Sequence, residues 1–254
     1  SDNSARITRG AVRWLIRETM GNLLLIGILF GIVGRWDWWN GWALSAIYIF
    51  WTLSTAILIL PVNPAMLAER ARLHKDTPKW DLIALSVLGV CTIATYVVAS
   101  LDVRWGWTPF PVWIGVYLPG LDVRWGWPSP MPLFLVQFIG FVVAVIGYDI
   151  LLVWAMVSNA FFVATVRIQT DRQHTVTSSG PYRYVRHPGY LGAMLLHLGT
   201  PFMLNSLWAI IPAGLTILVL IVRTILEDKT LQAELPGYAE YAERVRYRLL
   251  PGLW

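Results

Sequence analysis

The chain has 254 residues, of which 56% are hydrophobic and only 14% are charged, and it contains 15 tryptophans. A soluble domain carries about a quarter charged residues, so this composition predicts a membrane protein. The net charge of +5 does not indicate nucleic-acid binding, because the basic residues stand at the ends of apolar segments, where they set membrane topology. The single cysteine, Cys91, excludes an internal disulfide and any cysteine-based metal cluster.

Six apolar segments are interpreted as membrane-spanning helices, which need about 20 mostly apolar residues each. In chain order they are 18–34, 42–60, 82–101, 133–157, 190–204 and 207–226. The fifth is short, and only Asn205 and Ser206 separate it from the sixth, so these two are expected to form a helical hairpin. The fold class is therefore expected to be all-α, a polytopic helical membrane protein without a cleavable signal peptide at its start.

Lysine and arginine residues alternate between the two sides of these segments. They gather before the first segment, between the second and third, between the fourth and fifth, and after the sixth. The remaining connections carry only Arg35, Arg104 and Arg124. Because basic residues mark the cytoplasmic side, we expect a multi-pass protein of a prokaryotic cell membrane with both termini in the cytoplasm.

Two stretches between or after the spans are expected to lie at the membrane surface. Residues 63–75 are typical of a short amphipathic helix with Pro64 in its first turn. The tail, 231–254, is interrupted by Pro236 and Gly237, and it carries an apolar stripe at helical spacing that we interpret as packing. The stripe consists of Tyr238, Tyr241, Val245 and Leu249.

One heptapeptide occurs twice. LDVRWGW at 101–107 returns at 121–127, and the segment between the copies is too short and too rich in proline to cross a membrane. We interpret the pair as a duplicated outer loop whose tryptophans lie at the headgroup level. Within one membrane domain, residues 1–131 are expected to supply the N-terminal helices with this loop, and residues 132–254 a C-terminal catalytic region.

The connection after the fourth span is the first candidate for chemistry. It reads VRIQTDRQHTVTSSGPYRYVRHPGY, with a turn forced by Gly180 and Pro181. Pro188 can open the following helix, whose free N–H groups would form an anion site. Alternatively, Arg183 and Arg186 only enforce topology and contact lipid headgroups.

Further ionisable residues lie inside or beside the spans. Arg223 and Glu227 are one helical turn apart and can pair, with a snorkelling arginine as the plain alternative. His197 and Asp149 are expected mainly to be core residues. The four histidines lack the spacing of metal ligands, so no metal site is expected.

The quoted connection, followed by RTILED and then YAEYAERVRYRLLPGLW, resembles the isoprenylcysteine carboxyl methyltransferase family and its phospholipid methyltransferase relatives. The resemblance rests on an Arg-His-Pro-x-Tyr turn, here Arg186 to Tyr190, and on paired acids one hairpin later, here Glu227 and Asp228. It covers residues 165–254.

The resemblance implies S-adenosylmethionine as cofactor and a lipophilic or lipid-linked substrate. Arg223 and Glu227 would be catalytic: Arg223 would hold the substrate's anionic group, and Glu227 would take the cofactor's ammonium. The other implied cofactor-binding residues are Gln169, His174, Thr175, Val176, Thr177, Tyr182, His187, Pro188, Gly189 and Tyr190. Two positions depart from the family pattern, Asp228 as the second acid and the short spacing from Gln169 to His174.

The resemblance thus implies an integral-membrane methyltransferase. Methylation of a carboxylate oxygen is favoured because Arg223 beside the pocket fits an anionic substrate best, and a carboxylate needs no general base since it is ionised at neutral pH. Phospholipid amines and thiols stay open as acceptors. A nicotinamide-dependent reductase of the sterol and steroid type is an alternative with a similar turn. A transporter subunit would place its polar residues near the membrane midplane instead.

Overall fold

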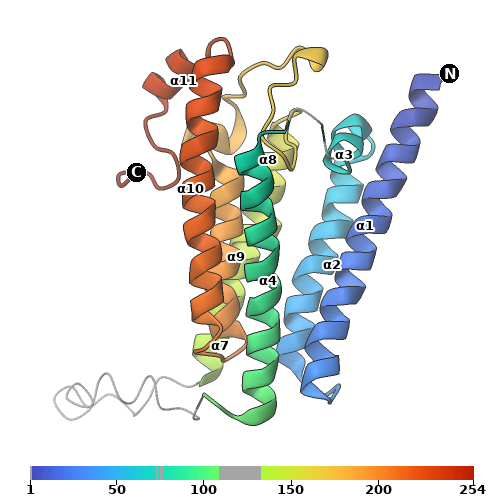
Figure 1. The fold of residues 1–254 in the computed structure, drawn as a ribbon, viewed down its shortest axis with the longest axis vertical. Coiled ribbons are helices and arrows are strands. Elements are labelled where there is room, and N and C mark those ends of the chain that lie inside the picture. Colours follow the sequence, from blue (N-terminus) through green and yellow to red (C-terminus); the bar gives the residue numbers. More distant parts are fainter. Residues whose placement is uncertain (1, 73, 75–76, 109–132) are drawn as a thin grey trace.

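The computed structural model describes residues 2–72, 74, 77–108 and 133–254, and within these ranges all regular structure is helical (Figure 1). The N-terminal helices are α1 Asp2–Val33, α2 Trp39–Ile59, α3 Pro64–Arg70 and α4 Lys79–Trp105. A continuous helical rod follows, made of α7 Leu133–Val145, the π-helix η1 Ile146–Leu152 and α8 Val153–Ser158. Two 3₁₀ turns, η2 Thr170–Arg172 and η3 Gly180–Arg183, precede α9 Pro188–Met203, α10 Ile210–Glu234 and α11 Tyr238–Arg244.

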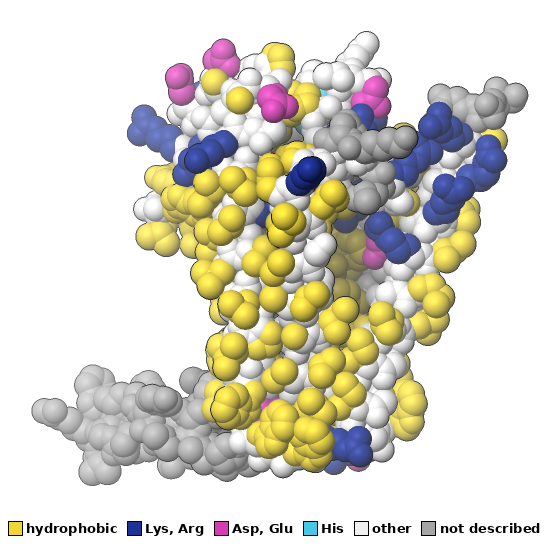
Figure 2. Space-filling model, in the orientation of Figure 1, with side chains coloured by type: hydrophobic (Ala, Val, Ile, Leu, Met, Phe, Trp, Pro, Cys, Tyr) yellow, Lys and Arg dark blue, Asp and Glu magenta, His cyan; other side chains and the backbone are white. Residues whose placement is uncertain are grey.

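Among the described residues, five helices are long and apolar enough to cross a membrane: α1, α2, α4, the α7–η1–α8 rod and α10. The expected all-α polytopic fold is therefore confirmed, whereas the predicted fifth span is α9, a helix of only 16 residues that pairs with α10. Figure 2 shows hydrophobic side chains along the middle of the bundle, with Lys and Arg gathered mainly at the end where α1 begins.

Helix α1 begins much earlier than expected, at Asp2 rather than near Glu18. The reason is visible in its arginines, Arg6, Arg9, Arg13 and Arg17, which recur every three or four residues and are all exposed. The opposite face buries Trp14 completely, and Gly10 packs so tightly on α3 that a methyl group there would lie 2.4 Å from the Ala68 Cβ. The basic stretch is thus amphipathic, not irregular.

Four glycines hold the rod against α9. A methyl group on Gly199 would lie 2.3 Å from the Gly140 carbonyl oxygen, and one on Gly192 would lie 2.5 Å from the Gly147 carbonyl oxygen. Glycine is required at such a close backbone approach, and small residues are typical of helix contacts in membranes. This contact fixes α9, and with it the start of α9, relative to the rod.

Replacing Gly199 with alanine is expected to destabilise the fold by about 1–3 kcal/mol, because overpacking forces two backbones apart. Gly89→Ala is the matched control, since Gly89 also lies inside a spanning helix but has open space where a methyl group would stand. Thermal unfolding in detergent should show a lower midpoint for Gly199→Ala and an unchanged or slightly higher one for Gly89→Ala. Equal midpoints would contradict the contact.

One end of the bundle is closed by a buried carboxylate, Asp102, near the end of α4. Asp102 accepts hydrogen bonds from the Thr108 backbone N–H at 2.6 Å and from the Ser206 hydroxyl at 2.5 Å, which ties α4 to the turn between α9 and α10. The prediction of a duplicated outer loop is wrong for its first copy, 101–107, because the residues of that copy up to Trp105 belong to α4. The second copy lies outside the described residues.

The other end, which we call the site end, carries α3, α8, α11 and the start of α9 (Figure 1). Helix α3 is shorter than the predicted 63–75 segment, but Pro64 does occupy its first turn and the Asn63 side chain accepts a hydrogen bond from the Met66 N–H at 3.2 Å. The loops between α8 and α9 lie over this end. The polar connection singled out in the sequence is thereby placed where several helices terminate.

Candidate functional site

A cavity opens at the site end and encloses about 820 Å³, including its open mouth. Five regions of the chain form its wall: the loop 159–167, the segment 174–177, η3, the start of α9, and the facing sides of α10 and α11. Segments more than 80 positions apart in the sequence thus meet in one site.

Most of the residues implied by the motifs line this cavity: His174, Thr175, Val176, Thr177, Tyr182, His187, Gly189, Tyr190, Arg223 and Glu227. Two do not. The Gln169 side chain is buried and occupied elsewhere, since it donates to the Phe161 carbonyl oxygen at 2.8 Å and accepts from Arg172 at 2.5 Å. Pro188 opens α9 as expected but is absent from the wall.

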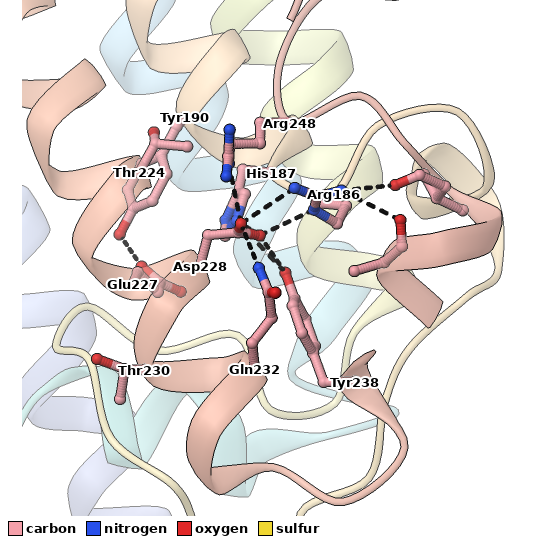
Figure 3. Close-up of polar contacts among 12 residues, drawn as sticks. Arg186, His187, Tyr190, Thr224, Glu227, Asp228, Thr230, Gln232, Tyr238 and Arg248 are labelled. Carbon is pink, nitrogen blue, oxygen red and sulfur yellow. Dashed lines mark hydrogen bonds and ion pairs between the residues drawn. The ribbon is translucent and has the colours of Figure 1, made fainter. Parts of the chain in front are cut away.

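Asp228 is the centre of a buried network behind the cavity (Figure 3). Its carboxylate is fully buried and accepts two hydrogen bonds from Arg186, one from Nε at 2.8 Å and one from Nη2 at 3.0 Å. The Arg248 Nε donates at 2.9 Å, and the His187 Nε2 lies 3.2 Å away. Tyr238 and Gln232 complete the set of donors.

The same network attaches the tail to the turn before α9. The N–H groups of Arg186 and His187 donate to the carbonyl oxygens of Tyr247 and Arg248, both at 2.9 Å. The Arg186 Nη1 also donates to the Val245 carbonyl oxygen at 2.9 Å. Arg186 is therefore bound by a carboxylate and by tail carbonyls, which is neither of the two interpretations that its position in the sequence left open.

Arg223 and Glu227 do not form an ion pair with each other. The Arg223 Nε binds Asp81 at 2.7 Å, and its Nη2 donates to the Ala164 carbonyl oxygen at 2.6 Å. Glu227 instead accepts a hydrogen bond from the Tyr190 hydroxyl (Figure 3). The guanidinium of Arg223 lies 5.2 Å from the centre of the Tyr190 ring, so Tyr190 contacts both charged residues.

The charges in the wall are unevenly compensated. Arg167, Arg186 and Arg223 each have a carboxylate partner, namely Glu69, Asp228 and Asp81, and none of these acids lines the cavity. Among the described wall residues, Glu227 is the acid that does. The cavity therefore presents one half-buried carboxylate beside the start of α9, whose first N–H groups have no preceding turn to bind.

Neutral polar groups lie beside these charges. The Asn159 Nδ2 donates to the Tyr182 hydroxyl at 3.3 Å, and the Thr177 hydroxyl donates to the Asn159 Oδ1 at 3.2 Å. Burial raises the pKa of Tyr182, to which nearby Glu227 contributes, so its hydroxyl stays neutral over the physiological range. The aromatic rings of Phe161, Phe162 and Tyr238 add apolar wall.

His174 is held neutral. Burial, and then the charges of Arg172 and Arg167, lower its pKa from 6.5 to about 4. Its ring centre lies 4.5 Å from that of Phe161, and its Nδ1 accepts the Gln169 N–H at 3.4 Å, which requires an unprotonated nitrogen. Gln169 therefore contributes to the cavity wall indirectly, because its backbone N–H holds the His174 ring in place.

Acidification is expected to loosen this part of the wall. Because the folded pKa is below the unfolded one, the unfolded chain binds more protons between pH 6.5 and 4, and stability falls as pH is lowered through that window. His174→Gln should make the unfolding midpoint less dependent on pH over this range than it is in the wild type. Parallel pH profiles for the two proteins would contradict the contribution of His174.

Several site residues were missed from the sequence. Asp81 lies 142 positions from Arg223, in the first turn of α4, and nothing in its local sequence marks it. Tyr238 and Tyr241 were interpreted as packing, and they are buried, but both also line the cavity. The part of the wall from 159 to 165 precedes the polar connection singled out in the sequence, and its place in the wall follows only from the fold.

The fold and site define a polytopic helical membrane protein with a cavity at one end, lined by most of the motif residues. The isoprenylcysteine carboxyl methyltransferase (ICMT) family model matches residues 138–233. Proteins of Oryza sativa subspecies indica and japonica, each named a probable protein-S-isoprenylcysteine O-methyltransferase, are 29% identical over 112 residues. The matched part is 43% of this chain and 59% of each relative. These matches confirm the resemblance to the ICMT superfamily.

Proposed function

We propose that this protein is an integral-membrane methyltransferase that uses S-adenosylmethionine and acts on a lipophilic acceptor. The observation that carries the proposal is Glu227, the one acid among the described residues of the cavity wall, beside the free N–H groups at the start of α9. The chain spans only 59% of the length of the curated relatives that it matches, so the activity is inferred and not transferred from them.

The residues present fit this cofactor. An ammonium group needs an acceptor without a competing cation, and among the described residues the side-chain partner of Glu227 is the neutral Tyr190 hydroxyl. A carboxylate needs donors, and the N–H groups of Gly189 and Tyr190 stand in the first turn of α9. The rest of the ligand would be enclosed by the segment 174–177 and by Tyr182. Gly189 lets the Phe162 ring of the cavity wall pack closely on the start of α9, because a methyl group there would lie 2.7 Å from that ring.

When bound, the cofactor supplies an electrophilic methyl group on a sulfonium. The protein's own contribution is then alignment of the acceptor and exclusion of water, not covalent catalysis. Arg223 is held rigidly by Asp81 and Ala164, and its Nη1 has no partner among the described residues. That nitrogen is suited to orient an acceptor carboxylate, which needs no general base because it is already ionised.

The same proposal includes the membrane setting. The basic residues concentrated at the site end (Figure 2) would place this end, and both termini, in the cytoplasm. A lipophilic acceptor would then reach the cavity from the inner leaflet of a prokaryotic cell membrane.

Calorimetry on the purified protein tests the proposal, with S-adenosylmethionine and NADPH titrated separately. We expect saturable binding of S-adenosylmethionine alone, followed by transfer of a labelled methyl group to lipophilic carboxylates. Binding of NADPH alone would favour the reductase alternative, and binding of neither would refute the proposed function.

A further inference from the structure

Arg223 and Glu227 carry opposite charges one helical turn apart on α10, yet they do not bind each other. Residues four positions apart on a helix are neighbours, and both side chains line the cavity. The described partner of Glu227 is instead the Tyr190 hydroxyl (Figure 3). A contact from outside this turn must therefore hold the arginine away from the acid.

The residue that holds Arg223 is Asp81, in the first turn of α4. Its carboxylate is fully buried, and one of its oxygens accepts a hydrogen bond from the Arg223 Nε at 2.7 Å. Helix α4 packs along α10 (Figure 1), so this ion pair joins two neighbouring helices. The Arg223 Nη2 also donates to the Ala164 carbonyl oxygen at 2.6 Å. The guanidinium is thus fixed at two points, and neither of them is Glu227.

The second carboxylate oxygen of Asp81 is occupied as well. It accepts a hydrogen bond from the Val166 backbone N–H at 2.7 Å, and Val166 belongs to the loop in the cavity wall. A carboxylate can serve both donors because its two oxygens only accept. Asp81 is not among the described residues of the wall, so it acts on the cavity through the groups that it binds.

The ion pair with Asp81 also changes the charge that a ligand meets in the cavity. A released guanidinium on α10 would compete with a cationic ligand for the Glu227 carboxylate. Even without binding Glu227, it would repel such a ligand, because charges are screened less inside a protein than in water. Bound to Asp81, Arg223 contributes little net charge, and Glu227 is available to a cation.

We propose that Asp81 is a positioning residue, which keeps Glu227 available to a cationic ligand group by holding Arg223 away from it. The inference rests on the proposed function for the identity of that group, the ammonium of S-adenosylmethionine. Asp81 lies outside the matched region 138–233. The N-terminal helices would therefore support cofactor binding without contacting the cofactor.

Asp81→Asn is the substitution that tests this role. It keeps the shape of the side chain but replaces one acceptor oxygen with an N–H donor, which would face another donor. The Val166 N–H is fixed by the backbone, whereas the Arg223 side chain can turn. We therefore expect the amide oxygen to keep Val166 and the guanidinium to be released toward Glu227.

Two adenosine thioethers report on the ammonium site in calorimetry. S-adenosylhomocysteine and methylthioadenosine share the nucleoside and the sulfur, and only the first carries an ammonium and a carboxylate. We expect the wild type to prefer S-adenosylhomocysteine, and Asp81→Asn to lose about tenfold or more of that preference, which corresponds to about 1.4 kcal/mol. An unchanged preference would overturn the proposal. An equal weakening of both ligands would also overturn it, because it would indicate a general distortion of the cavity.

A second substitution shows whether Asp81 acts through Arg223. Adding Arg223→Gln to Asp81→Asn removes the released cation, so the preference should return toward that of the wild type; no recovery would contradict the positioning role. Asp102→Asn is the matched control, since Asp102 is also buried on α4 and accepts from Thr108 and Ser206 at the opposite end of the bundle. It should leave the preference unchanged, and a loss equal to that of Asp81→Asn would reduce the effect to general destabilisation.

A measurement without ligand separates this inference from the proposed function. Arg223→Gln and Glu227→Gln, alone and combined, should show stronger coupling in their unfolding midpoints in the Asp81→Asn background than in the wild type, because the two residues bind each other only there. Equal coupling in both backgrounds would overturn the role of Asp81. If the wild type binds neither S-adenosylmethionine nor S-adenosylhomocysteine, the proposed function fails, while the coupling is still decisive for Asp81.

Discussion

Asp228→Asn is expected to lower the free energy of unfolding by about 3–5 kcal/mol, the usual cost of breaking a buried ion pair from one side. Asparagine keeps the shape of the side chain but removes the charge that Arg186 and Arg248 share. Both guanidiniums would then stand at the same buried point without a counter-charge. Because Arg186 also binds the tail, the turn before α9 and the tail should loosen together.

Thermal unfolding in detergent and protease cleavage of the tail would measure this effect. Glu234→Gln is the matched control, since Glu234 lies on the same helix but is exposed, and it should change the midpoint very little. A wild-type midpoint and an uncleaved tail in Asp228→Asn would show that the network does not hold the site end together.

Glu227→Gln is expected to weaken S-adenosylmethionine binding by about a hundredfold while leaving the fold intact. Removing one member of a buried charge pair costs about 2–5 kcal/mol, and each 1.4 kcal/mol is a factor of ten. Glu227 is outside the Asp228 network, and its one described partner is the Tyr190 hydroxyl, so the substitution leaves no buried cation unpaired.

Calorimetric affinity and unfolding midpoint should be measured together on this variant. Tyr190→Phe provides a second comparison, because it removes the hydroxyl but keeps the carboxylate, and it should weaken binding far less. An affinity of Glu227→Gln for S-adenosylmethionine equal to that of the wild type would refute the assignment of Glu227 as the site of the cofactor's ammonium group. A lowered midpoint without a change in affinity would make Glu227 a structural residue.

The neighbouring acids Glu227 and Asp228 show what the sequence could and could not predict. The RTILED motif located both, and helical geometry predicted that Glu227 would share a face with Arg223. The motif did not predict that the second acid would be buried under two arginines, because Arg186 and Arg248 come from other segments. Contacts between segments distant in sequence depend on the complete fold.

Hydropathy predicted six spans, and five of them are helices long and apolar enough to cross a membrane in the described part of the chain, since burial in lipid requires about 20 apolar residues in any fold. It failed where polar residues continue a helix: α1 starts at Asp2, and α10 continues to Glu234. The start of α9 was predicted from Pro188 because the chemistry of proline is local. The partner of Arg223 was not, since Asp81 belongs to another helix.

The hydrogen bonds from Arg186 and His187 to the tail have a consequence for the order of assembly. During synthesis, the turn before α9 leaves the ribosome about sixty residues ahead of the carbonyl groups that receive it. The helices can therefore enter the membrane while the cavity is still open and Arg186 has not yet bound the carbonyl oxygens of the tail. Completion of the site would be one of the last steps in the maturation of the protein, so a polypeptide interrupted before Val245 would be inserted but unfinished.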